Sequence, residues 1–151
     1  MIKVICVGKL KERYWKDAVI EYIKRISKYS KIELIECPDY NSNDINIILT
    51  QEKNEISKHI GSRDYVITLE IEGQQLDSVE LSKKIDSCFL NYPNLTFIIG
   101  GSYGIHEEIK KRSNFALSFS KMTFPHQMFR IMLLEQLYRS YRILNNESYH
   151  K

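Results

Sequence analysis

Several signatures of common protein classes are missing from this 151-residue chain. It has only three cysteines, they form no C-x-x-C pair, and none clusters with histidine at metal-ligand spacing. We therefore expect no disulfide framework and no metal site. Cys6 and Cys88 lie in apolar stretches, so inert buried thiols in a reduced compartment are the simplest interpretation.

Long hydrophobic runs are missing as well. No stretch approaches the roughly 18 apolar residues that a membrane-spanning helix needs. The apolar stretch Ile2–Val7 is too short for the core of a signal peptide and has the character of a strand. We therefore expect a cytoplasmic protein without a membrane segment.

Two phosphate-binding signatures are not found either. Only Gly8 follows the first expected strand, where a dinucleotide fingerprint needs three spaced glycines. No G-x-x-x-x-G-K-[ST] sequence occurs, which argues against a P-loop. A nucleotide-dependent oxidoreductase is therefore disfavoured.

The charge is unevenly distributed, although the net charge is only +3. Residues 1–28 contain eight Lys/Arg and three Asp/Glu, and residues 109–151 contain eight and two. Residues 32–108 instead contain five Lys/Arg and fourteen Asp/Glu. A polyanionic partner that contacts both ends fits this pattern, and an ordinary mixed surface explains it equally well.

Strands and helices are expected to alternate. Apolar or alternating runs indicate strands at Ile2–Val7, Lys31–Cys37, Tyr65–Ile71, Leu95–Ile99 and Phe115–Phe119. Helical spacing indicates helices at Arg13–Lys28, Ile45–Ile60, Val79–Leu90, Ile105–Arg112 and Pro125–Leu144. Gly73-Gln74-Gln75 has the composition of a turn. The pattern predicts one α/β domain, residues 1–151, with a mostly parallel sheet flanked by helices.

The last expected helix is apolar on more than one face. Its apolar residues are Met128, Phe129, Ile131, Met132, Leu133, Leu134, Leu137, Tyr138, Tyr141 and Leu144. Such a helix must be covered on both sides, either by its own domain or by a second subunit. In so small a domain we favour a homodimer.

Two loops carry features of a ligand site. In Gly100-Gly101-Ser102-Tyr103-Gly104, glycines follow a strand and allow close approach of a ligand to the backbone; a tight strand-to-helix turn is the alternative. In Leu117–His126, a strand leads through small hydroxyl and apolar residues into a helix. That composition suits an adenine ring and ribose, or a plain loop packed on the core.

Polar residues on and after the last helix form a third group: His126, Arg130, Glu135, Arg139, Arg142, Tyr149, His150 and Lys151. Arginine on an apolar helix is expensive to desolvate unless it meets an anion. Arg139 either pairs with Glu135 or contacts a ligand, and the residues alone favour neither. By default, Tyr149 and His150 belong to a frayed terminus.

Taken together, these segments resemble a known family. They are Val4–Gly8 with Lys9-Leu10-Lys11, Thr68-Leu69-Glu70, Ile99-Gly100-Gly101, Leu117–His126, Arg130, Glu135, Leu137-Tyr138-Arg139 and Tyr149-His150. They are similar to the ribosomal RNA large subunit methyltransferase H family, the pseudouridine-N3 methyltransferases of the SPOUT class. The resemblance covers the whole chain and is most specific from Ser113 to Arg139.

The resemblance implies a SPOUT-type α/β fold with a deep C-terminal trefoil knot, and a homodimer with each active site at the subunit interface. It implies S-adenosylmethionine as cofactor, and its contacts carry over to Leu69, Gly100, Phe119, Ser120, Lys121, Met122, Thr123 and Phe124. The implied substrate is a pseudouridine in helix 69 of 23S rRNA in the assembled ribosome. The positions implied in substrate handling or activity are His126, Arg139, Tyr149 and His150.

Two positions depart from the family pattern. Tyr40–Asp44 has no lysine where relatives often carry several, and Tyr103 is bulky for its place next to the glycines. The alternative function is a non-catalytic RNA-binding module, which would use the basic ends and ten tyrosines for stacking. Such a module would not bind S-adenosylmethionine.

Overall fold

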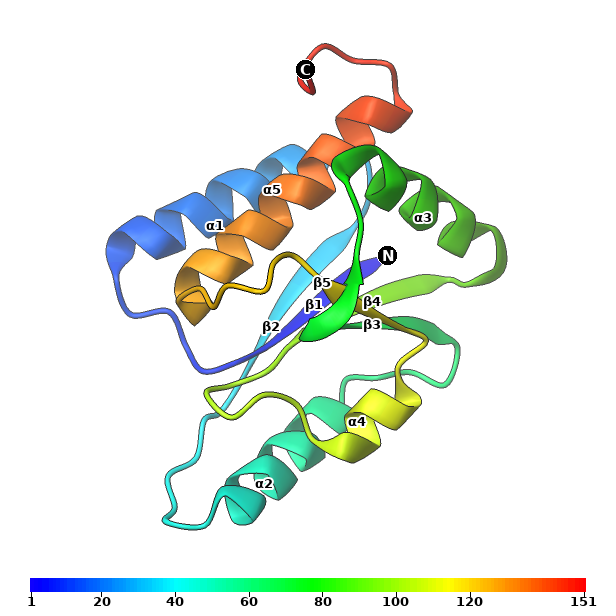
Figure 1. Cartoon of the computed structure of the whole chain (residues 1–151). Helices are drawn as coiled ribbons and strands as arrows, with labels where there is room; N and C mark the ends of the chain where they lie inside the picture. The colour runs from blue at the N-terminus through cyan, green and yellow to red at the C-terminus, as the bar shows by residue number, and fades with distance from the viewer.

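The computed structural model describes all residues, 1–151, and places a five-stranded sheet between two layers of helices (Figure 1). The strands are β1 (Ile2–Val7), β2 (Ile32–Cys37), β3 (Asp64–Gln75), β4 (Asn94–Ile99) and β5 (Phe115–Ser118). The helices are α1 (Arg13–Ile26), α2 (Ile45–Ser57), α3 (Ser78–Asn91), α4 (Glu107–Arg112) and α5 (His126–Leu144). The strand order is β2-β1-β4-β3-β5, and all four neighbouring pairs are parallel. The expected α/β fold with a parallel sheet is confirmed.

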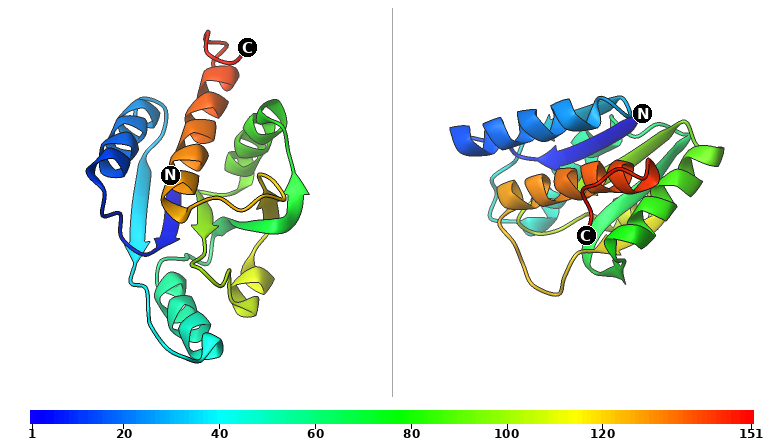
Figure 2. Two further views of the ribbon diagram at one scale, coloured as in Figure 1. Left: turned by 60° about the vertical axis from the view of Figure 1, so that its left-hand side comes forward. Right: turned by 90° about the horizontal axis from the view of Figure 1, so that it is seen from above.

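Both faces of the sheet are covered. Helices α1, α3 and α5 lie on one face, and α2 and α4 lie on the other (Figures 1 and 2). This is why β1 is buried along its whole length: alternate side chains belong to two different cores. Val4 and Cys6 belong to the larger core beneath α1, α3 and α5, whereas Ile5 and Val7 belong to the smaller one beneath α2 and α4.

Helix α5 lies between α1 and α3, as the view from above shows (Figure 2). Leu133, Leu134 and Leu137 are fully buried in the larger core. Other apolar residues of the helix stay partly open, and Met128 is 39% exposed. The helix is therefore covered by its own chain on the sheet side and on both flanks, and only its outward side stays partly open.

The expected turn at Gly73-Gln74-Gln75 is wrong, because these residues belong to β3. The pairing of β3 with β5 is interrupted after Leu69 and resumes at Gln74, so the intervening residues bulge out of the ladder. Gly73 allows this, since a Cβ there would lie 2.8 Å from the backbone of Ala116 and Leu117. The glycine thus marks a close approach of two strands.

The three cysteines are free and buried, and burial raises the pKa of Cys6 to about 12, which makes that thiol unreactive. None of the five helices combines the length and apolar character needed to cross a bilayer. No three His, Cys, Asp or Glu side chains gather so as to hold a metal ion.

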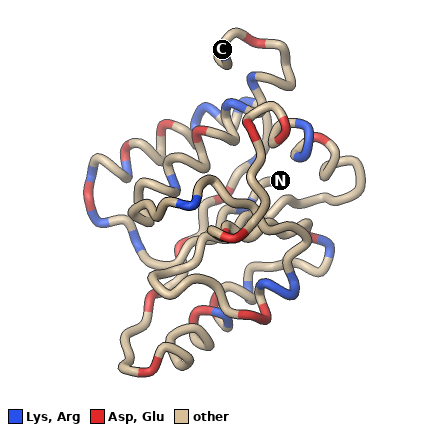
Figure 3. The backbone as a smooth tube through the Cα atoms, viewed as in Figure 1, with Lys and Arg blue, Asp and Glu red and all other residues tan.

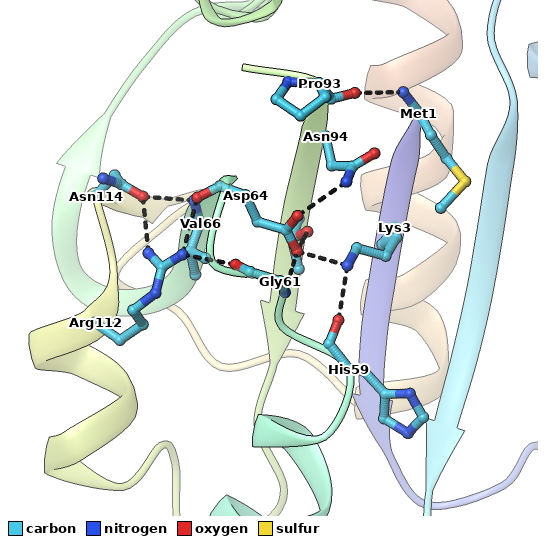
Figure 4. A network of polar contacts seen from close by, with 11 residues as sticks. Met1, Lys3, His59, Gly61, Asp64, Val66, Pro93, Asn94, Arg112 and Asn114 are labelled. Atoms are coloured by element: carbon cyan, nitrogen blue, oxygen red, sulfur yellow. Dashed lines mark hydrogen bonds and ion pairs between the residues drawn. The ribbon is translucent and has the colours of Figure 1, made fainter. Parts of the chain in front are cut away.

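A buried ion pair joins the amino-terminal ends of β1, β3 and β4 (Figure 4). Lys3 Nζ lies 2.5 Å from the Asp64 carboxylate, which also accepts hydrogen bonds from Gly61 N, Asn94 Nδ2 and Thr96 Oγ1. Burial alone raises the pKa of Asp64, but the hydrogen bonds from Lys3 and its other donors outweigh burial and hold the pKa below the usual 3.8. The ion pair lies at the edge of the sheet opposite the glycine loop, residues Gly100–Gly104 after β4.

Asp64→Asn should lower the free energy of unfolding by about 3 kcal/mol, because Lys3 would remain buried without its counter-charge. The wild-type contribution is present above pH 3.8 and is lost as pH falls through the lower folded-state pKa. Urea unfolding at several pH values measures both effects. Asp17→Asn, at an exposed pair with Arg13, is the matched control and should cost less than about 0.5 kcal/mol. Equal effects of the two substitutions would show that the buried network is unimportant.

Candidate functional site

A cavity of about 460 Å³ opens beyond the carboxyl ends of β4 and β5, beside the middle of β3, in the region where ligands of open α/β sheets usually bind. We call it the strand-end cavity. Its lining residues are Leu69, Glu70, Ile71, Glu72, Ile99, Gly100, Gly101, Ser102, Gly104, Ile105, Lys110, Leu117, Phe119, Ser120, Met122, Thr123, Phe124, His126 and Phe129. The volume and the mixed apolar and polar lining suit a small organic ligand.

The bulge of β3 forms one wall. Because pairing with β5 stops after Leu69, the residues Glu70, Ile71 and Glu72 turn toward the cavity. Glu70 accepts a 2.6 Å hydrogen bond from Thr68 Oγ1 and lies 3.7 Å from Lys110 Nζ. Sequence reasoning missed these wall residues, because the only local sign of the bulge, Gly73, reads as a turn.

The glycine loop after β4 forms the opposite wall. Gly101 and Gly104 pair as an isolated antiparallel bridge, with Gly104 N donating to Gly101 O at 3.1 Å. A Cβ on Gly100 would lie 2.5 Å from the carbonyl oxygen of Gly104, so only glycine fits this turn. Tyr103 stands at its tip, 53% exposed, and does not line the cavity.

The loop from β5 to α5 closes the cavity. It is ordered by short local hydrogen bonds: Ser118 Oγ donates to Ser120 O, and Met122 N donates to Ser120 Oγ. The rings of Phe119 and Phe124 pack on Phe129 of α5, with centroids 4.9 and 6.4 Å away. The loop is therefore fixed at both ends while its backbone borders the cavity.

Seven of the eight residues expected to contact the cofactor line this one cavity: Leu69, Gly100, Phe119, Ser120, Met122, Thr123 and Phe124. Lys121 belongs to the same loop, but it is exposed and does not line the cavity. Three segments that are far apart in the sequence thus meet at one edge of the sheet.

His126 also lines the cavity, at the first position of α5. Burial, and secondarily the charge of Arg130, lowers the pKa of His126, which favours a neutral imidazole at neutral pH. Arg130 is itself buried and donates to Val7 O and Gly8 O at 2.9 and 2.8 Å, and it pairs with Glu36 at 2.8 Å. It thereby ties the start of α5 to the end of β1.

Arg139, Tyr149 and His150 lie elsewhere, around Glu135. Arg139 and His126 are thirteen positions apart on α5, which corresponds to roughly 20 Å along the helix. None of these three residues lines the strand-end cavity of its own chain. The residues expected to handle the substrate are therefore divided between two places.

The residues after α5, Asn145–Lys151, form the tail of the chain. Their composition suggested a frayed terminus, but the tail folds back along the carboxyl-terminal half of α5. Asn146 takes a left-handed φ of 55°, which asparagine tolerates and which reverses the chain. Glu147 pairs with Arg142 and accepts a hydrogen bond from Tyr29 OH at 2.8 Å. The Tyr149 ring meets Tyr138 edge-on with centroids 4.9 Å apart.

A groove of about 510 Å³ runs beside α5, on the side of α1 and α3. We call it the helix groove. It is lined by Trp15, Tyr22, Leu76, Asp77, Ser78, Leu81, Leu117, Phe119, Met128, Ile131, Met132, Glu135 and Gln136. Leu117 and Phe119 also line the strand-end cavity, so the two hollows share a wall.

Charges of both signs are interspersed along α1 (Figure 3). Two of its arginines pair within the helix, Arg13 with Asp17 and Arg25 with Glu21. The basic amino-terminal segment therefore forms a partly neutralised surface, and charge alone does not define an RNA-binding face.

Comparison with known proteins gives the class. The family model described as "Predicted SPOUT methyltransferase" matches residues 1–150. The chain belongs to the SPOUT methyltransferase family. Two relatives from Clostridium botulinum strains, Alaska E43 and Eklund 17B, are each named "Ribosomal RNA large subunit methyltransferase H". They are 52% and 51% identical, over 99% of this chain and 99% of their own length.

A solved structure supports the fold. It is titled "The structure of a probable methylase family protein from Haemophilus influenzae Rd KW20". It aligns with a TM-score of 0.54 at 14% identity, over 99% of this chain and 70% of that one. At this identity the likeness concerns the fold alone.

Proposed function

We propose that this chain is an S-adenosylmethionine-dependent methyltransferase that methylates N3 of a pseudouridine in helix 69 of 23S rRNA, within the assembled ribosome in the cytoplasm. Residues 1–151 form its single domain, with the last strand, loop and helix in a trefoil knot. Family membership and the names of the relatives support a ribosomal RNA substrate. The observation that carries the proposal is the strand-end cavity, at which the expected cofactor-binding segments meet.

The cavity fits S-adenosylmethionine in size and chemistry. Gly100 packs tightly on Gly104 and so shapes the turn that borders the cavity, and the loop Phe119–Phe124 offers apolar side chains and backbone groups to a purine ring and a ribose. When bound, the cofactor supplies an electrophilic methyl group. The chain's own task is to hold the target nitrogen in line with that group, which positioning can accelerate greatly.

N3 of a uracil-type ring carries a proton that must leave. His126 is on the cavity wall, and its lowered pKa keeps the imidazole neutral, so it can accept that proton. A cationic group near the ring would stabilise the developing anion, and Arg139 has the required charge. Within one chain, however, Arg139 is about a helix length away from His126.

A homodimer resolves this separation. The partly open apolar face of α5, including Met128, and the adjoining helix groove offer a surface for a second copy. In an arrangement related by a twofold axis, Arg139, Tyr149 and His150 of one copy would approach the strand-end cavity of the other. Each active site would then combine the cavity of one subunit with the tail of its partner.

The activity is tested with labelled S-adenosylmethionine. Calorimetry should show that the protein binds S-adenosylmethionine. Assembled ribosomes should be methylated much faster than a free helix 69 oligonucleotide. The affinity of the protein for ribosomes should fall as the salt concentration rises. Wild-type protein that binds RNA without binding the cofactor would leave the non-catalytic RNA-binding module as the better account.

The assembly is tested by mixing two inactive variants. Light scattering should give twice the 17.9 kDa mass of one chain. His126→Ala and a chain lacking Tyr149–Lys151 should each be inactive, whereas their mixed dimer should recover one intact site. No recovery from verified mixed dimers would contradict a site shared between subunits, and an active monomer would exclude it.

A further inference from the structure

Glu135 connects the groups that the proposed function places in the tail half of the site. Its Oε1 atom accepts hydrogen bonds from Arg139 Nε at 3.0 Å, from Arg139 Nη2 at 2.5 Å and from Tyr149 OH at 3.1 Å. Its Oε2 atom accepts from Gln136 Nε2 at 2.9 Å. One carboxylate thus serves two of the residues expected to handle substrate.

The third residue joins through the arginine. Arg139 Nη1 lies 3.1 Å from His150 Nδ1, and the guanidinium lies over the Tyr149 ring at 4.7 Å from its centroid. The guanidinium of Arg139 is therefore held in three ways: Nε and Nη2 donate hydrogen bonds to Glu135, Nη1 contacts His150, and its carbon lies over the ring of Tyr149. Removing the carboxylate would release the arginine edge and the tyrosine hydroxyl together.

We propose that Glu135 is a positioning residue for methyl transfer, which fixes Arg139, Tyr149 and His150 as one preformed unit. The proposal rests on the proposed function, because it concerns the substrate-handling half of that site. Glu135 lines the helix groove and does not line the strand-end cavity. It acts through the residues it holds and does not touch the reacting atoms of its own chain's cavity.

A second carboxylate, that of Glu147, also holds the tail, so the role of Glu135 can be tested separately from the anchoring of the tail. Glu147 pairs with Arg142 and with Tyr29, so it fixes the first part of the tail without contacting the proposed unit. Loss of Glu135 should therefore leave the chain reversal after α5 in place. What should be lost is the common orientation of the arginine, the phenol and the imidazole.

The hydrogen bond from Tyr149 to Glu135 affects a measurable property, the pKa of the Tyr149 phenol. Burial, together with the hydrogen bond to Glu135, raises the pKa of Tyr149 to about 12, so the phenol stays protonated and donates its proton to the carboxylate. A neutral amide at position 135 would accept a weaker hydrogen bond and would not repel the phenolate. The ring titration of Tyr149 therefore reports directly on Glu135, whether or not a substrate is present.

The experiment compares Glu135→Gln and Glu135→Ala with wild type on assembled ribosomes. In Glu135→Ala, kcat should fall about 100-fold, because the unit loses its orientation. In Glu135→Gln, kcat should fall less, since glutamine retains an acceptor of the same shape. The Kd for S-adenosylmethionine should stay within twofold of wild type, and the mass by light scattering should remain that of the dimer. The Tyr149 pKa, from carbon NMR of labelled tyrosines assigned with Tyr149→Phe, should move down from about 12 toward 10 in both variants.

Glu21→Gln is the matched control. It removes the same charge from an i,i+4 pair with arginine, at 2.9 Å from Arg25, on the exposed side of α1. It should leave kcat and the Tyr149 titration unchanged. Wild-type kcat in Glu135→Ala, or an unmoved Tyr149 pKa, would overturn the positioning role. If wild type itself transfers no methyl group, the proposed function fails, and the NMR titration still shows whether Glu135 holds the tail.

Discussion

Replacing Gly100 by alanine should weaken S-adenosylmethionine binding by about 100-fold, measured by calorimetry. An added Cβ would lie 2.5 Å from the carbonyl oxygen of Gly104 and 2.8 Å from Ile105 Cγ1. The first of these is a backbone atom, so the turn itself must move. Forcing an extra methyl group into packed structure costs about 1–3 kcal/mol, and 1.4 kcal/mol corresponds to a tenfold change in affinity.

Gly104→Ala provides the control on the same turn. Its Cβ would meet no atom within 4 Å, but its φ of +84° is unfavourable for alanine. It should therefore cost about 1–2 kcal/mol of stability and reduce affinity much less than Gly100→Ala does. If the two substitutions weaken binding equally, general strain in the loop is the cause, and the tight packing of Gly100 on Gly104 has no special part in cofactor binding.

The order of strands and helices was predictable from the sequence because their periodicity is strong. β1 is apolar throughout, as a strand buried on both faces must be, and α1 shows one clear stripe. The glycine loop and the loop before α5 were also identifiable, since their composition departs from that of their neighbours. Their meeting at one cavity follows from the parallel sheet, which brings strand ends to one edge.

The bulge in β3 was not predictable in the same way. Gly73-Gln74-Gln75 has the composition of a turn, and only its pairing with Leu117 and Ser118 more than forty residues later makes it a strand. The path of the tail is a similar case. Asn145 and Asn146 after an apolar helix indicate a helix end. The path that follows depends on Glu147, which is hydrogen-bonded to Tyr29, 118 residues away in the sequence. Long-range contacts of this kind leave no local pattern.

Deleting Tyr149–Lys151 should reduce methyl transfer to ribosomes by about 1000-fold, the upper end of the loss expected when a charge-stabilising group fails, because Arg139 would lose two residues that orient it. The Tyr149 ring packs on Tyr138, and its hydroxyl donates to Glu135, so the deletion also removes some native contacts. Losing one such cluster costs about 1 kcal/mol, which lowers Tm by about 2–4 °C in a chain of this size. Affinity for S-adenosylmethionine should not change, because no tail residue lines the strand-end cavity.

Three measurements separate the possible roles of the tail: single-turnover methyl transfer, cofactor calorimetry and thermal unfolding. Lys151→Ala is the control for altering the end of the chain, and it should behave as wild type because Lys151 is exposed. Full turnover by the truncated protein would show that Tyr149 and His150 take no part in the reaction. Loss of cofactor affinity together with turnover would place the tail in the cofactor site of the partner subunit, instead of on the substrate. Retained affinity with lost turnover is the result we expect, because Arg139, Tyr149 and His150 are held around Glu135 and lie apart from the cavity that Gly100 shapes.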